Sequence, residues 1–407
     1  MNYDYDAIVI GGGPAGSSFA RITAGGGLNV LVVDKRKEIG IPVRCGEGLS
    51  EREVFKEKLD LPASCRSVKI EGAKVVAPNG KEIIWKSEHT RGWVLERKCF
   101  DKWLAELAVE KGAKVHTYTR ALGIIKDDKG KPDGVRLSHG GRETYDVRAP
   151  LIVSAEGMES FMAREMGFKT VHSLYDVDTC YQYEMKPYDH QNLIELYFGN
   201  ALAPRGYVWI FPKAGKKANV GIGIGGNVSN GMKPGGVAGA DPKKLLDEFI
   251  AKNAQLKDSS TLIDFGGVIS VSAPIDTFVK DKCMVIGTAA KQVDPIHGGG
   301  IANSMECGVL AANTAIEAFA KKDFSKELLY SLYEKPWRET AGKRMAKRLL
   351  LRKVMEKISD DDFNHIFNMM GDNDIADIMK GNFAPSVAKV LATRPQLLGI
   401  LSTLLEK

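Results

Sequence analysis

The chain has 407 residues, enough for two or three domains, and its 44% hydrophobic and 27% charged residues are typical of a globular protein. Residues 1–10 carry two Asp and run directly into an apolar segment, so we expect no secretory signal, and no uncharged apolar run is long enough to span a membrane. The six Cys form no C-x-x-C pair, which argues against bound metal, and we expect reduced thiols in a cytoplasmic protein.

The first part of the chain predicts a βαβ unit followed by mixed structure. Residues 5–10 and 29–33 are mostly apolar and predict buried strands, and residues 15–24 between them predict a helix. The Gly-rich stretch 39–50 predicts a loop. The other predicted elements of this part are strands at 67–76, 81–86, 113–117, 135–138 and 150–155 and a helix at 100–111.

The middle of the chain has a different pattern. Residues 179–185, 193–198, 206–211 and 218–224 alternate apolar and polar positions, which predicts an antiparallel sheet. The chain then returns to a buried strand at 284–286, a Gly-rich segment and a helix over 301–320, and residues 325–407 are predicted to be helical.

The sequence between the first strand and the first helix matches G-x-G-x-x-G at Gly11, Gly13 and Gly16. In this motif the first Gly permits the sharp turn, the second lets a pyrophosphate approach, and the third lets the helix pack on the strand. Asp34 ends the second strand, 18 residues beyond Gly16, where a carboxylate accepts hydrogen bonds from a ribose. The sequence therefore predicts a dinucleotide site.

A second Gly-rich junction, at residues 285–301, also lies between a predicted strand and a predicted helix. Two distant junctions of this kind predict a long cofactor held at both ends, and therefore FAD. We expect the backbone N–H groups of Gly299, Gly300 and Ile301 to face the pyrimidine edge of a flavin, where the helix dipole stabilises the reduced ring.

These segments resemble the geranylgeranyl reductase family of p-hydroxybenzoate-hydroxylase-like flavoproteins. The resemblance rests on residues 11–20, 42–50, 206–224 and 294–305, in that order, and covers nearly the whole chain. The segment PVRCGEG in the second of these is similar to the archaeal-type digeranylgeranylglycerophospholipid reductases.

The predicted fold class is α/β, with a Rossmann-type FAD-binding domain, an antiparallel-sheet substrate domain and a C-terminal helical region. The FAD-binding domain is predicted to be discontinuous and to consist of residues 1–60, 96–165 and 265–325. The substrate domain for the prenyl lipid is predicted at residues 61–95 and 166–264. The C-terminal helical region is predicted at residues 326–407.

The motif and the resemblance together imply FAD contacts along the whole cofactor. They are expected at Gly11, Gly13, Ala15, Gly16, Asp34, Lys35, Cys45, Gly46, Gly48, Arg97, Ala121, Thr288, Asp294, Gly299, Gly300 and Ile301. One position departs from the pattern, because flavoproteins of this class usually carry Gly-Asp where this chain has Gly287-Thr288. A hydroxyl replaces some hydrogen bonds of that Asp to the flavin ribityl chain but carries no charge.

Three further features have two interpretations each. Cys45 is either a thiol that affects the flavin or a small packed side chain. His297 is either a proton donor or a loop residue with a satisfied hydrogen bond, and the second is favoured. Tyr207, Trp209 and Phe211 share one strand face, and with Pro212 they predict an apolar wall for a prenyl chain rather than an ordinary half-buried sheet.

Charge is concentrated late in the chain. The net charge is +6, and residues 321–357 hold twelve Lys or Arg against five Asp or Glu. Stripes at 343/347 and 344/348/352 are compatible with an amphipathic helix on anionic lipid, a clamp on a substrate phosphate, or a solvated face. No recognition motif for nucleic acid accompanies them.

The resemblance implies FAD-dependent saturation of geranylgeranyl chains in isoprenoid ether phospholipids at a membrane surface. Flavin N5 would deliver the hydride, and an unassigned group the proton. The chain shows one complete dinucleotide motif, so the reductant is expected to be external, either ferredoxin or a reduced nicotinamide. Two alternatives remain: an FAD-dependent monooxygenase on the same fold, and an isoprenoid-binding or electron-transfer flavoprotein.

Overall fold

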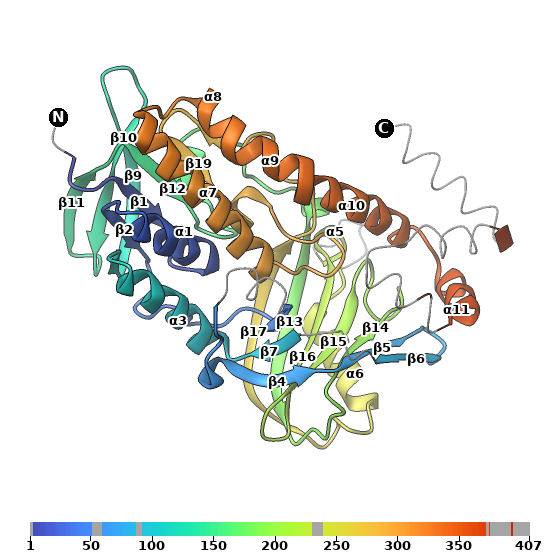
Figure 1. The fold of residues 1–407 in the computed structure, drawn as a ribbon. Helices are drawn as coiled ribbons and strands as arrows, with labels where there is room; N and C mark the ends of the chain where they lie inside the picture. Colours follow the sequence, from blue (N-terminus) through green and yellow to red (C-terminus); the bar gives the residue numbers. More distant parts are fainter. Residues whose placement is uncertain are drawn as a thin grey trace.

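The structure is a computed structural model that describes residues 3–50, 59–86, 92–229 and 239–371, together with residues 374 and 392–393. It places a parallel sheet with its helices in one half of the molecule and a large, mostly antiparallel sheet in the other (Figure 1). A nearly continuous series of helices over residues 326–355, here called the helical track, runs along both halves. The predicted α/β class with a C-terminal helical region is confirmed.

The first half is built on a six-stranded sheet in the order β18-β19-β12-β1-β2-β8. Its neighbours run parallel except for the edge pair β18–β19. The strands are β1 (Ala7–Ile10), β2 (Val30–Val33), β8 (Lys114–His116), β12 (Leu151–Ser154), β18 (Val279–Lys280) and β19 (Cys283–Val285). The residues of β1, β2 and β12 are all buried, as expected for a sheet covered on both faces.

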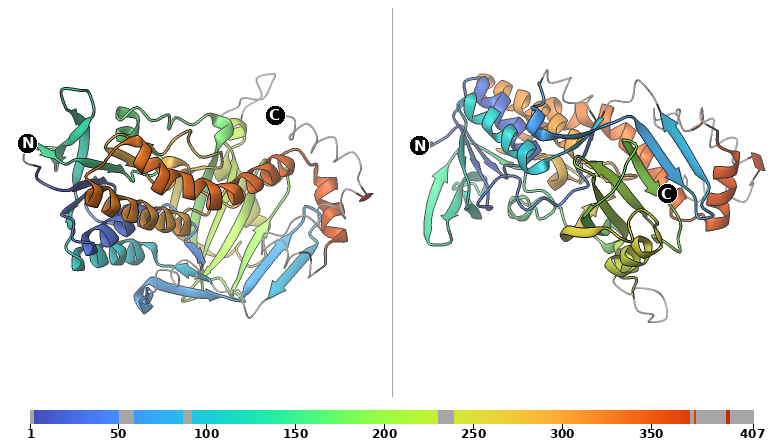
Figure 2. Two further views of the ribbon diagram at one scale, coloured as in Figure 1. Left: turned by 45° about the horizontal axis from the view of Figure 1, so that its top comes forward. Right: turned by 90° about the horizontal axis from the view of Figure 1, so that it is seen from below.

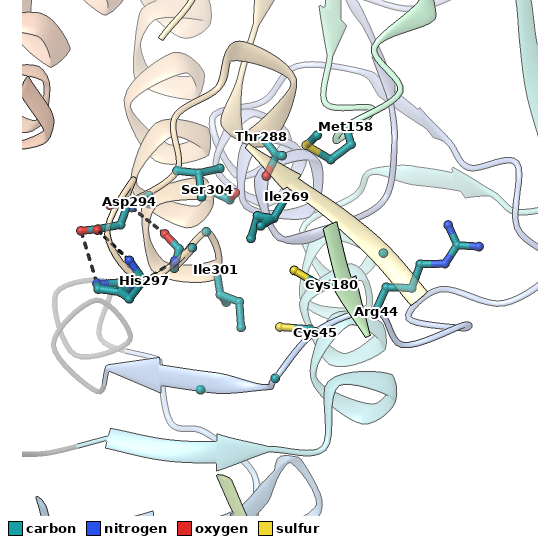
Figure 3. Close-up of a pocket in the computed structure, with 18 of the residues that line it drawn as sticks. Arg44, Cys45, Met158, Cys180, Ile269, Thr288, Asp294, His297, Ile301 and Ser304 are labelled. Carbon is teal, nitrogen blue, oxygen red and sulfur yellow. Dashed lines mark hydrogen bonds and ion pairs between the residues drawn. The ribbon is translucent and has the colours of Figure 1, made fainter. Parts of the chain in front are cut away.

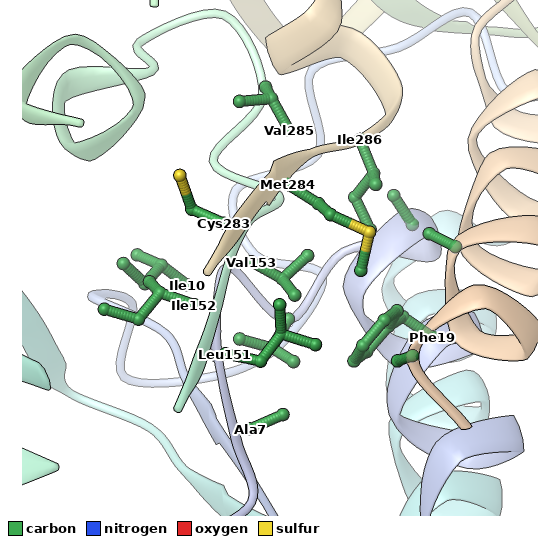
Figure 4. Packing of buried hydrophobic residues seen from close by; sticks show 14 of the residues in the cluster. Ala7, Ile10, Phe19, Leu151, Ile152, Val153, Cys283, Met284, Val285 and Ile286 are labelled. Carbon is green, nitrogen blue, oxygen red and sulfur yellow. The ribbon is translucent and has the colours of Figure 1, made fainter. Parts of the chain in front are cut away.

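Helices α1 (Pro14–Gly25), α3 (Arg97–Glu110) and α7 (Ile301–Lys321) gather on one face of this sheet (Figure 1). Phe19 projects from α1 into the core beside Leu151 and Met284, and all three side chains are almost completely buried (Figure 4). The other face carries the antiparallel sheet of β9 (Thr119–Lys126), β10 (Pro132–His139) and β11 (Glu143–Arg148).

The second half is a seven-stranded sheet in the order β17-β13-β16-β15-β14-β5-β6. The strands are β5 (Gly72–Val76), β6 (Glu82–Lys86), β13 (Val177–Lys186), β14 (Leu193–Tyr197), β15 (Tyr207–Lys213), β16 (Lys217–Gly225) and β17 (Ser260–Ser270). Its pairs are antiparallel except that β14 pairs with β5 in parallel. That pairing joins segments more than a hundred residues apart, so no local alternation pattern predicts it.

Strand β17 is absent from the predicted strands, and it crosses the predicted domain boundary between residues 264 and 265. Its residues lie at the edge of the sheet and are mostly exposed, so the period-two signal of a half-buried strand is weak. A smaller sheet of β3 (Gly48–Ser50), β7 (Gly92–Leu95) and β4 (Arg66–Ile70) joins the two halves. Short elements complete these halves: α4 (Phe161–Glu165), α5 (Gly226–Ser229), α6 (Pro242–Lys252), η1 (Ala63–Cys65), η2 (Leu174–Asp176) and η3 (Gly287–Ala290).

The helical track consists of α8 (Lys326–Leu329), η4 (Tyr330–Glu334), α9 (Lys335–Trp337), η5 (Arg338–Gly342) and α10 (Lys343–Met355). Helix α11 (Asp360–Met369) follows and lies beside β5 and β6 in both views of Figure 2. The Asn79 N–H donates to Asn364 Oδ1 at 2.9 Å and ties α11 to the β5–β6 hairpin. Most of the predicted helical region beyond residue 371 lies outside the described residues.

We predict that Phe19→Ala lowers the free energy of unfolding by about 3–5 kcal/mol, because the truncation leaves a cavity between α1 and the parallel sheet. Urea unfolding monitored by circular dichroism measures this loss. Val109→Ala on the exposed face of α3 is the control, and its effect is expected to stay within about 0.5 kcal/mol. Equal effects from both variants would contradict the packing described for Phe19.

Candidate active site

A cavity of 2290 Å³ lies between the parallel sheet, the large sheet and helix α10. Pockets for one small ligand usually measure about 300–1,000 Å³, so this cavity has room for a cofactor and a second ligand. With the exceptions of Gly16 and Pro212, the predicted cofactor and substrate residues line it. Residues from opposite ends of the sequence therefore share one space.

Two helices begin at this cavity without a side-chain cap among the described residues. Gly13 is the N-cap of α1, and Gly300 is the N-cap of α7. The first N–H groups of a helix have no partner within it, and the helix dipole makes that end partly positive. Both helix ends therefore offer donors to negatively charged or carbonyl groups of a ligand.

Glycine is needed at the three motif positions for different structural reasons. A Cβ on Gly11 would lie 2.4 Å from the Ala155 carbonyl oxygen, and a Cβ on Gly16 would lie 1.9 Å from the Gly11 carbonyl oxygen. A Cβ on Gly13 would meet no heavy atom within 4 Å among the described residues. The fold itself thus requires Gly11 and Gly16, whereas Gly13 keeps space open in the cavity.

Asp34 lies at the end of β2, against the Gly-rich turn. Its Oδ2 accepts the Gly12 N–H at 2.9 Å, and its Oδ1 accepts the Arg36 N–H at 2.8 Å. The carboxylate is 9% exposed and lines the cavity, so its remaining lone pairs can accept from a ligand hydroxyl. Lys35 forms an ion pair with Glu159 beside it.

The second Gly-rich junction is held by a compact polar network around Asp294. Arg348 Nε lies 2.7 Å from Asp294 Oδ2. His297 Nε2 lies 3.3 Å from the same oxygen, and Figure 3 shows these two side chains facing each other. Burial opposes ionisation, but His297 and Arg348 lower the pKa of Asp294 well below its usual range.

His297 also accepts the Gly299 N–H on Nδ1 at 3.1 Å. That contact assigns the ring proton to Nε2, which faces Asp294. Both ring nitrogens therefore have partners in the loop, which matches the interpretation of His297 as a satisfied loop residue.

The loop that carries Cys45 lies opposite the start of α7. Figure 3 shows the side chains of Cys45, Cys180 and Ile301 directed into one space. Cys45 Sγ accepts the Glu47 N–H at 3.2 Å. Arg97 lines the cavity near this loop and forms two hydrogen bonds to Asp101, at 2.8 and 2.7 Å. The pair holds the guanidinium in a fixed orientation.

The aromatic strand β15 forms one wall of the cavity. Tyr207, Trp209 and Phe211 line it and contact one another in sequence. The Tyr207 hydroxyl donates to the His297 carbonyl oxygen at 2.8 Å, and burial raises the pKa of Tyr207, so the phenol stays neutral. Pro212 is buried and does not line the cavity, because strand alternation turns it to the opposite face.

Beyond this wall the cavity continues as an apolar arm. Its lining residues come from β5, β6, β14, α10 and α11 and from the residues that directly adjoin them, and are Val75, Trp85, Ile194, Leu196, Phe198, Leu351, Val354, Met355, Ile358, Phe363, Ile366, Phe367 and Met370. The predicted site does not include these residues. Each element contributes only a few of them, so no single stretch of sequence contains a recognisable motif.

Helix α10 is docked on this site by two arginines. Arg348 pairs with Asp294, and Arg352 Nη2 lies 2.7 Å from Asp178 Oδ1 on β13. The Arg352 side chain is buried and also donates to the Pro295 carbonyl oxygen. These two residues of the predicted basic stripe are therefore structural, whereas Lys343, Arg344 and Lys347 are exposed and line the cavity.

The described residues contain no cluster of His, Cys, Asp or Glu that could hold a metal ion. Within the same residues, no helix has the length and apolar character that crossing a bilayer requires.

The Gly-rich turn on a parallel sheet, the second uncapped helix and the apolar arm define a flavoprotein-type α/β oxidoreductase. A solved myxobacterial chondrochloren halogenase, described as a variant of FAD-dependent halogenases, has this fold, with a TM-score of 0.70 at 18% identity over 93% of this chain and 90% of that chain.

Closer relatives identify the family. A model of the geranylgeranyl reductase catalytic domain matches residues 176–269. The digeranylgeranylglycerophospholipid reductase of Methanosarcina mazei is 41% identical over 378 residues, covering 91% of this chain and 90% of the relative. A solved geranylgeranyl bacteriochlorophyll reductase-like protein of Thermoplasma acidophilum has a TM-score of 0.87 at 34% identity, over 98% of this chain and 99% of that chain. The chain belongs to the geranylgeranyl reductase family.

We predict that Arg352→Met destabilises the protein by about 3–5 kcal/mol at pH 7, because it leaves Asp178 buried without its partner. Burial already raises the pKa of Asp178, and Arg352 opposes that shift, so the pKa rises further in the variant. A raised pKa contributes stability at low pH that is lost as pH rises. The deficit should therefore shrink as pH falls toward about 4, the usual pKa of an Asp.

Urea unfolding at several pH values measures this deficit. Arg352→Met combined with Asp178→Asn is the control, and it is expected to regain stability at pH 7 because no buried charge remains unpaired. A deficit that is the same at pH 7 and pH 4.5 would place the cost in packing rather than in the ion pair.

Proposed function

We propose that this protein is an FAD-dependent reductase that saturates the C=C bonds of geranylgeranyl chains in isoprenoid ether phospholipids. The observation that carries the proposal is the continuous cavity, which passes from the two uncapped helix ends along the aromatic wall into the apolar arm. The names of the family relatives support the substrate class.

The residues present fit FAD. Gly13 and Ala15 at the start of α1 would bind the pyrophosphate, and Asp34 the ribose of the adenine half. Thr288 would contact the ribityl chain, and Gly300 and Ile301 at the start of α7 would bind the flavin ring. Lys35, Gly46, Gly48, Arg97 and Ala121 line the same space and complete the proposed contacts, whereas the Gly299 N–H is already used by His297.

When bound and reduced, FAD supplies a hydride from N5. The chain's own residues would hold an isolated alkene beside it in a space that Trp209, Phe211 and Ile269 keep free of water. The Tyr207 hydroxyl donates its proton to the His297 carbonyl oxygen, and the His297 N–H faces Asp294. We therefore assign neither residue as the donor of the proton that is added to the alkene. Burial raises the pKa of Cys180, which keeps it a neutral thiol in the same space.

The reductant is proposed to be external, either ferredoxin or a reduced nicotinamide, because FAD uses the complete dinucleotide motif. The wall formed by α10 has two parts, with Lys343, Arg344 and Lys347 at its beginning and Leu351, Val354 and Met355 toward its end. This order suits an amphiphile with an anionic head and apolar chains. We propose that the protein acts in the cytoplasm at a membrane surface, with these three cations near the phosphate of the phospholipid substrate.

The test of the function is mass spectrometry of digeranylgeranylglycerol phosphate after anaerobic incubation with dithionite-reduced protein. Stepwise gains of two hydrogens are expected. Unchanged lipid that remains bound would favour an isoprenoid-binding or electron-transfer protein. Hydroxylation of phenols coupled to oxidation of a reduced nicotinamide in air would favour a monooxygenase.

We predict that Gly13→Val yields a folded protein without FAD. Gly13 has φ −76° and ψ −174°, an extended conformation that Val adopts readily, but the new side chain fills the space for the pyrophosphate. Absorbance at 450 nm and FAD titration measure the loss, and the melting temperature of the apoprotein should stay near that of the wild type. Gly16→Val is the contrasting variant, because its Cβ overlaps Gly11 and should destabilise the apoprotein itself. Full FAD binding by Gly13→Val would refute the cofactor site.

We predict that changing Lys343, Arg344 and Lys347 to Glu raises the KM for the prenyl phospholipid and leaves turnover of a detergent-dispersed prenyl alcohol nearly unchanged. Each cation near an anionic group contributes roughly 1 kcal/mol, which salt screens. The matched control changes Lys335 and Lys353 on the same helical track and Lys357 in the turn after α10, all three of which are exposed and do not line the cavity. Equal effects of the two triple variants would indicate general attraction to anionic membranes, and loss on both substrates would indicate misfolding.

A further inference from the structure

The loop of residues 44–48 faces the proposed flavin site but is positioned by the opposite half of the molecule. Glu47 is 3% exposed, and its Oε2 lies 2.6 Å from Lys213 Nζ on β15. The same oxygen accepts from Asn219 Nδ2 on β16 at 2.7 Å, and Oε1 accepts the Arg97 N–H at 2.8 Å. Lys213 also pairs with Glu96 and Glu184. Burial opposes the charge of Lys213, but Glu47 and Glu96 raise its pKa, so it stays protonated.

The loop also rests directly on the aromatic wall. A Cβ on Gly46 would lie 3.0 Å from Phe211 Cε2 and 3.4 Å from Trp209 Nε1, so the backbone is in contact with both rings. Asn219 Nδ2 additionally donates to the Gly46 carbonyl oxygen at 3.3 Å. The loop is therefore packed directly on β15 and hydrogen-bonded to β16.

Gln182 links this wall to the loop through both ends of its amide. It lies on β13, is 3% exposed and lines the cavity. Its Oε1 accepts the Trp209 indole N–H at 3.3 Å, and its Nε2 donates to the Cys45 carbonyl oxygen at 3.2 Å. Among the side chains of its size, a carboxamide offers a donor and an acceptor that are both neutral.

We propose that Gln182 is a positioning residue that couples the substrate wall to the cofactor loop. The chain Trp209–Gln182–Cys45 fixes the separation between the aromatic wall and the loop at Cys45, and would thereby set how a prenyl chain on that wall lies relative to a bound flavin. This inference rests on the proposed function for its substrate. Lipid that displaces the indole also displaces the loop through these two hydrogen bonds, so Gln182 acts on hydride transfer without touching the reacting atoms.

Two substitutions separate the two links. Gln182→Met keeps the length of the side chain but removes both hydrogen bonds. Gln182→Glu keeps an acceptor for Trp209 and removes the donor to Cys45. Because a misplacement of about 1 Å costs roughly a hundredfold in rate, both variants should lower kcat about ten- to hundredfold and change KM much less.

A readout that needs no cofactor is the indole N–H resonance of Trp209 in ¹⁵N-tryptophan-labelled apoprotein. The chain has five Trp, and Trp209→Phe identifies the signal. Gln182→Met should move this resonance upfield, because its hydrogen bond is lost, whereas Gln182→Glu should leave it hydrogen-bonded. In the FAD-loaded protein, lipid binding should shift the flavin absorbance in the wild type and much less in both variants.

Thr179→Val is the matched control. Thr179 lies on the same strand, does not line the cavity, and loses one hydrogen bond to Ser229 in this variant. It should leave the indole resonance, kcat and the flavin response near the wild type. An unmoved resonance in Gln182→Met, or a moved one with unchanged kcat and flavin response, would overturn the proposal. If the wild type reduces no prenyl lipid but its flavin response to bound lipid still depends on Gln182, the proposed reaction fails and the coupling stands.

Discussion

The unsatisfied N–H groups at the starts of α1 and α7 are the constraint on which the site depends. Both helices have glycine N-caps, and no described side chain caps them. A buried donor without a partner costs about 1–3 kcal/mol, so each helix start favours a ligand that accepts hydrogen bonds. The two ends face one cavity because α1 and α7 pack on the same face of the parallel sheet (Figure 1). That arrangement suits one long cofactor bound at both ends.

Two ion pairs of α10 determine how the large-sheet half of the molecule is positioned next to the proposed cofactor site. Arg348 joins α10 to Asp294 in the loop before α7, and Arg352 joins the same helix to Asp178 on the large sheet. One helix thereby contacts both halves through ion pairs. Removing one partner of such a pair would destabilise the fold, because it would leave an unpaired charge away from water. The apolar arm beyond Leu351 then follows from the direction of α10 and α11 along β5 and β6. The same helix presents its unburied cations to the cavity.

The loop around Cys45 illustrates how a proposed cofactor contact can depend on the large sheet in the other half of the molecule. Its position follows from Lys213, Asn219 and Gln182, which come from three strands of the large sheet. The aromatic wall and the loop are thus parts of one hydrogen-bonded unit. The PVRCGEG and GYVWIFPK segments, which are far apart in the sequence, are therefore in direct contact in the structure.

The sequence by itself determined the elements whose signal is local. The βαβ turn at Gly11–Gly16, the position of Asp34 and the shared face of Tyr207, Trp209 and Phe211 depend on spacing within one or two elements, and the structure has them as expected. Tertiary structure decided the rest. Arg352 and Arg348 look like surface cations in a helical stripe, and only the packing of α10 pairs them with Asp178 and Asp294 and buries Arg352. Gln182 and the parallel β5–β14 pair depend on strands brought together over long distances, and such pairing follows the energy of the whole core rather than any local pattern.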